Sequence, residues 1–151
     1  MKRVVLSLLV MIGLLATPVA LASDKSLEAA LKPYKAKLTT DIAYLANFKA
    51  PTKSKAAAAT KELGKIASTL NGAKKAAEDN QASSSKGKAG RTDVINGLTD
   101  ALSAASDGKS AASAAKSGKG SSAKSHAKSE KTEIDKAIPL LETGGTDLKL
   151  F

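Results

Sequence analysis

Apolar residues recur at steps of three and four along much of the chain, a spacing that predicts amphipathic helices. The most regular run is a heptad-like seam in which steps of three and four alternate without a miss. Its positions are Ala56, Ala59, Leu63, Ile66, Leu70, Ala73 and Ala77. Gly64 and Gly72 each weaken this helix by about 1 kcal/mol, and Gly72 is a candidate for its end. Residues 80–90 are rich in Ser, Lys and Gly and predict a loop.

An earlier segment, residues 27–48, predicts a second helix with one apolar face. The residues on that face are Leu27, Leu31, Tyr34, Leu38, Ile42, Leu45 and Phe48. Pro33 interrupts the pattern, because proline in a helix interior costs about 3 kcal/mol. Either the main helix begins near Pro33, or a short helical turn precedes a kink there. Ala50 and Pro51 end the segment.

A third helix is expected to start near Thr92 or Asp93, because either residue is a suitable N-cap. Its apolar face comprises Val94, Ile95, Leu98, Leu102 and Ala105. Asp107 and Gly108 offer a stop to this helix.

A last, short helix is expected after Thr132, with Asp135 as a capping-box partner. Ile134, Ile138 and Leu141 form its apolar face. Pro139 interrupts it, and Gly144 and Gly145 end it. The apolar tail that follows, residues 148–151, is expected to dock on the bundle, with a recognition peptide as the alternative.

Between these helices, residues 103–129 differ sharply in composition. Of these 27 residues 20 are Ala, Ser or Gly, and none is a branched aliphatic or an aromatic. Alanine favours helix whereas serine and glycine oppose it, so we expect a flexible segment or a frayed helical extension that cannot anchor a core.

These patterns predict an all-α protein, a small up-and-down bundle of three to four helices with a flexible Ala/Ser/Lys/Gly-rich segment. We expect the bundle core in residues 23–102, the low-complexity segment in 103–129, and a short helix with its apolar tail in 130–151. A signal helix precedes the bundle in this interpretation.

Residues 1–22 have the pattern of a cleaved secretion signal. Lys2 and Arg3 form a positive start, an uncharged and mostly aliphatic run follows, and Ala20 and Ala22 frame a small-x-small cleavage site. The alternative is a retained anchor, because about 20 uncharged residues are enough to cross a bilayer. The chain has no cysteine, so disulfides, Cys-zinc sites and a cysteine-linked lipid are excluded. We therefore expect a secreted or periplasmic bacterial protein.

Charge favours an anionic partner. Without Lys2 and Arg3, the chain carries 22 Lys and Arg against 14 Asp and Glu, and Arg91 is the only arginine left. Lysine acts as a hydrated point charge and lacks the bidentate fork of arginine, so binding would be diffuse and salt-sensitive. The candidate polyanion-binding residues are Lys109, Lys116, Lys119, Lys124 and Lys128. Solubilisation of an Ala-rich bundle is an equally good explanation for these lysines.

Catalytic chemistry is poorly supported by the sequence. His126 is the only histidine and lies in a polar stretch without positioned partners. Glu130 and Glu133 are expected to form an ion-pair network with Lys128, Lys131 and Lys136. The string at residues 116–120 resembles a phosphate-binding loop only through composition. We expect no enzyme activity, no metal and no cofactor.

The sequence thus predicts an exported, non-enzymatic interaction module with weak affinity for polyanions. Its expected partners are anionic envelope polymers, lipid headgroups, or a protein that contacts a helix face; nucleic acid does not fit an exported address. The alternative function is a secreted, cationic, membrane-active protein of the bacteriocin or toxin type, suggested by the amphipathic first helix.

Overall fold

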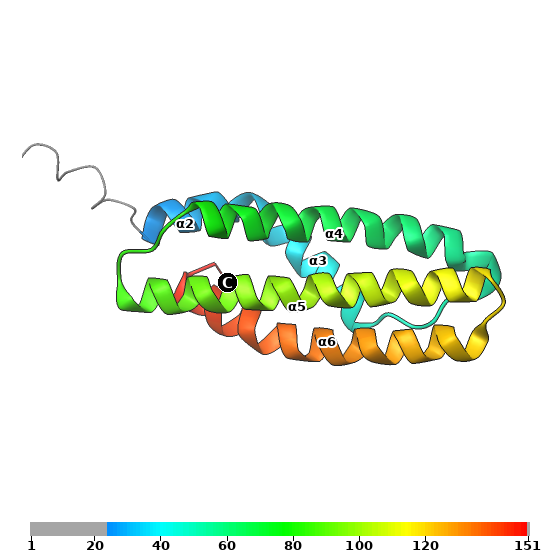
Figure 1. Cartoon of the computed structure of the whole chain (residues 1–151). Coiled ribbons are helices and arrows are strands. Elements are labelled where there is room, and N and C mark those ends of the chain that lie inside the picture. The colour runs from blue at the N-terminus through cyan, green and yellow to red at the C-terminus, as the bar shows by residue number, and fades with distance from the viewer. Residues whose placement is uncertain (1–23, 151) are drawn as a thin grey trace, which may run out of the picture.

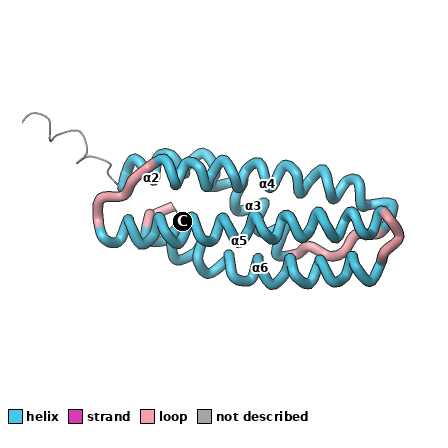
Figure 2. The backbone as a smooth tube through the Cα atoms, viewed as in Figure 1, coloured by secondary structure: helices cyan, strands magenta, loops and turns pink. Residues whose placement is uncertain are grey.

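The computed structural model describes residues 24–150, so the expected signal segment lies outside the described residues. Within them all regular structure is helical, and no strand occurs. The helices are α2 (Asp24–Leu31), α3 (Lys35–Ala46), α4 (Ala56–Asp79), α5 (Ser85–Lys116) and α6 (Gly120–Asp147), with 3-10 turns at Lys32–Tyr34 and Lys53–Lys55. Figures 1 and 2 show an elongated bundle in which α2 and α3 form one kinked arm beside three longer helices. The predicted all-α bundle is confirmed.

The kink in the first arm falls at Pro33. A single 3-10 turn, Lys32–Tyr34, separates α2 from α3, so the predicted short helix before a kink is the arrangement observed. The apolar face of both helices points inward, with Leu27, Leu31, Leu38 and Leu45 buried in the main core.

The predicted seam of α4 packs as expected. Six of its seven positions are buried, and Ala59 is half-buried. The helix continues through Gly72, where a Cβ atom would lie 2.9 Å from Cε1 of Tyr34. Gly72 therefore makes room for the Tyr34 ring and does not end the helix.

The predicted bounds of the last two helices are wrong. Helix α5 begins at Ser85, where the hydroxyl of Ser84 accepts a bond from the Gly87 amide, and it continues past Gly108 to Lys116. Helix α6 begins at Gly120 and runs through Pro139. Both cross the expected boundaries at 102/103 and 129/130 without a break.

Residues 103–129 are accordingly helical except at the turn 117–119, and the expectation that they cannot anchor a core is wrong. Their small side chains are buried along α5 and α6, among them Ala104, Ala111, Ala115 and Ala123. Because small side chains let two helix backbones approach closely, a stretch without branched aliphatics still packs.

Glycines set the close contact between α5 and α6. A Cβ atom on Gly144 would lie 2.7 Å from the carbonyl oxygen of Gly90 and 2.9 Å from the amide nitrogen of Val94. A Cβ atom on Gly97 would lie 2.7 Å from Cγ of Leu141. Gly144, which we expected to end the last helix, is therefore an interface residue.

The C-terminal tail docks on the bundle, as predicted. Leu148 and Leu150 are buried in the main core. Leu150 lines a small cavity together with Leu31 of the first arm, Val94 of α5 and Leu141 of α6.

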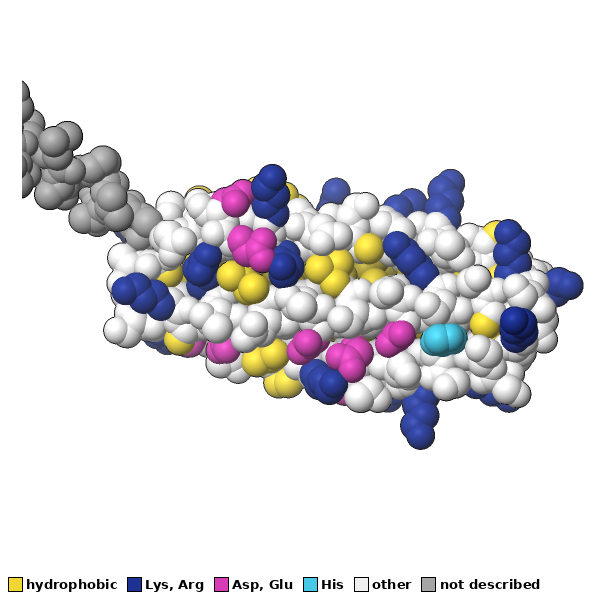
Figure 3. All heavy atoms as spheres, in the orientation of Figure 1, with side chains coloured by type: hydrophobic (Ala, Val, Ile, Leu, Met, Phe, Trp, Pro, Cys, Tyr) yellow, Lys and Arg dark blue, Asp and Glu magenta, His cyan; other side chains and the backbone are white. Residues whose placement is uncertain are grey.

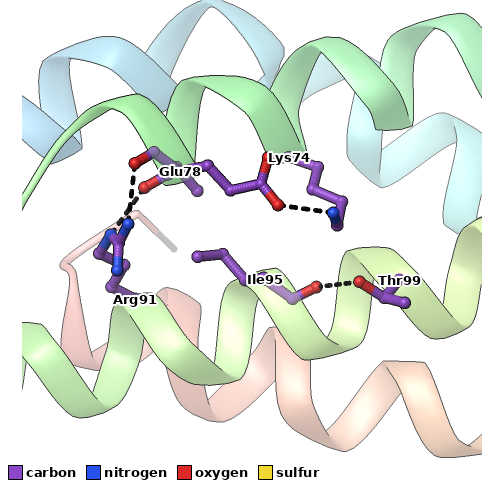
Figure 4. A network of polar contacts seen from close by, with 6 residues as sticks. Lys74, Glu78, Arg91, Ile95 and Thr99 are labelled. Atoms are coloured by element: carbon purple, nitrogen blue, oxygen red, sulfur yellow. Dashed lines mark hydrogen bonds and ion pairs between the residues drawn. The ribbon is translucent and has the colours of Figure 1, made fainter.

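The lone arginine of the described chain has a structural role at the α4–α5 connection (Figure 4). Nε of Arg91 donates to the carbonyl oxygens of Ala77, at 2.7 Å, and Asn80, at 2.9 Å, and Nη2 donates to that of Glu78, at 2.8 Å. These carbonyls belong to the C-terminal end of α4, where a cation also complements the helix dipole. Arg91 is thus committed to this cap.

Replacing Arg91 tests this cap. We expect Arg91→Ala to lower the free energy of unfolding by about 2 kcal/mol, because three charge-assisted bonds are lost and the carbonyls of α4 are left unpaired. Arg91→Lys should recover less than half of that loss, because lysine lacks the fork. Urea denaturation measures both, with the exposed Lys88→Ala as a control expected within about 0.5 kcal/mol of the wild type.

Two glycine substitutions test the α5–α6 contact. Gly144→Ala should cost about 1–3 kcal/mol, because its methyl group meets backbone atoms of α5 that cannot move aside. Gly64→Ala on α4 should stabilise by up to about 1 kcal/mol, since nothing lies within 4 Å of the added atom. We expect Gly144→Ala to lower the urea midpoint and Gly64→Ala to raise it. Equal shifts would contradict the close contact between Gly144 and α5.

Candidate functional site

One end of the bundle, where α5 turns into α6 and α4 begins, carries a dense set of lysines. This set, called the basic end below, comprises Lys49, Lys53, Lys55, Lys61, Lys109, Lys116, Lys119, Lys124 and Lys128. Figure 3 shows basic side chains and no visible carboxylates around the right-hand end of the molecule, whereas basic and acidic side chains lie together over the remainder.

The charge separation is complete in the sequence of this end. Its two segments, residues 48–61 and 108–129, contain nine lysines and no Asp or Glu. All 14 carboxylates of the chain lie elsewhere, where 13 Lys and Arg of the described residues nearly balance them. The net positive charge of the described chain is therefore confined to one end.

The lysines of the basic end have free ammonium groups. All are exposed except the half-buried Lys109, and none forms an ion pair or side-chain hydrogen bond within residues 24–150. Lysines elsewhere do form ion pairs, such as Lys74 with Glu78 at 2.6 Å and Lys131 with Asp135 at 3.0 Å. The basic end thus keeps its charge available to a partner.

Alanines hold this end together. The first arm stops at Ala46, short of the basic end, and an extended connection leads on to the start of α4 (Figures 1 and 2). A small separate core of Ala56, Ala115 and Ala123 joins α4, α5 and α6 beyond that point. Lys109 and Lys128 lie about seven or eight residues from the α5–α6 turn, or ~12 Å along a helix.

The turn itself is a helix-ending motif. Gly118 has a φ of +75°, a conformation that favours glycine. The Lys119 amide donates to the Ala114 carbonyl at 2.9 Å, and the Gly118 amide donates to that of Ala115 at 3.0 Å. This pair of bonds is the Schellman arrangement. It accounts for the glycine in residues 116–120, and no strand precedes the turn within the described chain.

Two helix N-termini, those of α4 and α6, also lie at this end. Neither has a side-chain cap, and the residues at their N-cap positions are Lys55 and Lys119. Helix N-termini carry partial positive charge, so they add to the field of the lysines.

All five lysines predicted from the sequence lie at the basic end, on α5, α6 and the turn between them. Sequence reasoning missed Lys49, Lys53, Lys55 and Lys61, which the fold brings to the same place. The absence of carboxylates, shared by residues 48–61 and 108–129, was the signal that linked the two segments.

The acidic residues behave differently from each other. Glu133 pairs with Lys136 at 2.9 Å, as expected, and Lys131 pairs with Asp135, a residue outside the expected network. The ion pair expected of Glu130 is wrong: its side chain is 0% exposed, and neither carboxyl oxygen has a hydrogen-bond partner. Among the described residues no group of three or more His, Cys, Asp or Glu is arranged to hold a metal.

Burial raises the pKa of Glu130 from 4.5 to about 7. Lys131 opposes this shift, and the negative charges of Asp135 and Asp107 add to it.

Burial also raises the pKa of Asp41 and that of Tyr44, with a smaller contribution to Tyr44 from Glu62 and Glu130. By contrast, hydrogen bonds donated by the Ser84 hydroxyl and the Ser83 amide lower the pKa of Asp24. These bonds also connect the start of α2 to the residues just before α5.

A shallow apolar groove of about 600 Å³ separates α3 from α6 away from the basic end. It is lined by apolar residues, among them Leu38, Ile42, Ile138 and Leu141, and also by Glu142.

His126 is half-buried on α6, without a hydrogen-bond partner in the described residues. Neither feature assembles a nucleophile, a base and an orienting partner.

Comparisons with protein-family models, curated proteins and solved structures found no match to this chain.

Stability is expected to depend on pH through Glu130. A carboxyl group whose pKa is raised by folding contributes to the stability of the folded state, and this contribution is fully present below about pH 4.5. It is lost as the pH rises to about 7. Glu130→Leu should raise the free energy of unfolding by about 3 kcal/mol at pH 8 and by much less at pH 4.5. Glu133→Leu, on the same helix, is the control and should change it by under about 1 kcal/mol at both pH values.

Proposed function

We propose that this protein is an exported, non-enzymatic helical module that binds anionic polymers of the cell envelope through its basic end. The observation that carries the proposal is the complete separation of charge: nine unpaired lysines and no carboxylate at one end of the bundle. Lysines that only kept the bundle soluble would be expected all over its surface, interspersed with acids.

The chemistry of the basic end favours diffuse recognition. Arg91, the single arginine of residues 24–150, caps α4 and is not available for bidentate contacts with a polyanion. Lysine side chains present mobile point charges, so they attract phosphate or sulfate groups without fixing a monomer sequence. We infer that a flexible polyanion fits this end better than a small ligand of defined shape.

The alternative, a membrane-active protein, loses the observation that suggested it. The apolar face of the first arm packs in the bundle, with Leu27, Leu31 and Leu45 buried. No helix in residues 24–150 is long and apolar enough to cross a bilayer.

Binding of the purified protein to fluorescent long-chain polyphosphate tests the proposal. We expect log affinity to fall linearly with log salt, with a slope of about −0.7 for each lysine that contacts the polymer. The variant that changes Lys109, Lys116, Lys119, Lys124 and Lys128 to Gln should bind at least about tenfold more weakly in 50 mM salt.

A matched control separates the basic end from net charge. It changes five exposed lysines of the remaining bundle, Lys25, Lys32, Lys37, Lys75 and Lys88, to Gln and so has the same net charge. This control should keep its affinity within about twofold, because its lysines lie among carboxylates. Equal losses in both variants, or affinity independent of salt, would contradict binding by the basic end.

Leakage of dye from anionic vesicles addresses the alternative function. We expect vesicles to stay intact at micromolar protein, because the apolar residues needed for insertion are packed in the core. Leakage that survives loss of the five basic-end lysines would favour the membrane-active alternative.

A further inference from the structure

Glu130 occupies a core position of α6. Counting back from Leu141 in steps of four and three gives Ala137, Ile134, Glu130 and Ala127, and then Ala123. Apart from the half-buried Ala127, all of these residues are buried. An acid therefore stands where a helix seam ordinarily carries an aliphatic residue.

Lys131 partly compensates a negative charge on Glu130, but no hydrogen bond stabilises its carboxylate. The groups that act on it are Asp107 on α5 and, on α6 itself, Lys131 and Asp135; on α3, the hydroxyl of Tyr44 is itself sensitive to the charge of Glu130. On α4, Glu62 acts on Tyr44 and not on Glu130. A buried carboxylate without hydrogen bonds is costly, whereas the neutral acid is tolerated.

The position of Glu130 along the bundle is as important as its burial. Asp107 and Gly108 lie near the level where the leucine core ends, since a Cβ atom on Gly108 would meet Leu63 at 3.1 Å and Phe48 at 3.6 Å. Beyond that level the buried apolar side chains of the three helices are alanines, namely Ala56, Ala111, Ala112, Ala115 and Ala123. This end of the bundle, called the tip below, buries little apolar area. The part of α6 before Glu130, residues 120–129, is therefore the part most easily released.

We propose that Glu130 makes the packing of the first part of α6, residues 120–129, against α4 and α5 dependent on pH. With a neutral carboxyl group, α6 packs fully and holds the lysines of the tip together. Ionisation of the same group favours a state in which the tip opens and Glu130 reaches water, while the leucine core stays folded.

The sign and range of the effect follow from linkage. Opening lowers the pKa of Glu130 from about 7 towards its ordinary value of 4.5, so the open state gains weight as the pH rises between these values and levels off above 7. The open fraction is expected to rise by about 50-fold between pH 5 and pH 8.

A consequence for ligand binding rests on the proposed function. Lysines held in one cluster bind a polyanion more tightly than the same lysines on a released and mobile segment. We therefore expect affinity for polyphosphate to be higher at pH 5 than at pH 8, even though lysine charge is constant over this range.

Hydrogen exchange measured by NMR tests the docking step without any ligand. After correction for intrinsic rates, amides of residues 111–115 and 123–129 should lose about 50-fold in protection between pH 5 and pH 8. Amides of residues 94–102, beside the leucine core, should change much less. In Glu130→Gln, protection of the tip should no longer depend on pH.

Control variants make the outcomes decisive. His126→Gln, which replaces the only histidine of the sequence, is measured in parallel and should retain the pH dependence. Glu133→Gln tests a carboxyl group on the same helix and should behave as the wild type. Tip protection that is independent of pH in the wild type, or unchanged dependence in Glu130→Gln, would overturn the proposal.

The two proposals fail in different ways. If exchange follows pH through Glu130 but polyphosphate does not bind, the docking inference stands and the proposed function is wrong. If polyphosphate binds through the basic end with no exchange effect, the reverse holds.

Discussion

The close contact between α5 and α6 is the interaction on which the rest of the structure depends. It can form because glycine and alanine occupy most of the facing positions, with Gly90, Gly97 and Gly144 where backbones and side chains approach most closely. This contact turns a composition poor in large apolar residues into a packed helix pair. The first arm and α4 then place their leucines against it, and the tail fills the remaining gap with Leu148 and Leu150.

This mode of packing divides the molecule into two parts with different properties. Leucine and isoleucine stabilise one part, which also holds every carboxylate of the chain. Alanine holds the other part, which has only lysines as charged side chains. The part that has the most charge to offer a partner is thus the part with the least apolar area to keep it closed, and Glu130 lies where the two meet.

The sequence was sufficient where apolar periodicity was strong. The seam of α4 was predicted from spacing, a kink at Pro33 was one of two alternatives that the cost of an interior proline left open, and docking of the tail was predicted from its apolar composition. Prediction failed where small residues carry the packing, because Gly108 and Gly144 look like helix stops until the facing helix is known. Glu130 was assigned to an ion-pair network because lysines lie near it in sequence. Its place in the apolar seam is visible only when α6 is extended back beyond Thr132. Four lysines of the basic end were missed because their segment is remote in sequence.

Because the net positive charge of residues 24–150 lies at one end, the described bundle has an electric dipole along its long axis. In the field of an anionic surface, such a dipole experiences a torque that turns the lysines toward the surface before contact is made. Asp24 is bonded to Ser83 and Ser84, and Leu148 lies beside Gly90, so both ends of the described chain are at the opposite pole. A molecule oriented in this way stands upright, with its long axis along the surface normal and with Asp24 and Leu150, the ends of the described chain, directed away from the surface.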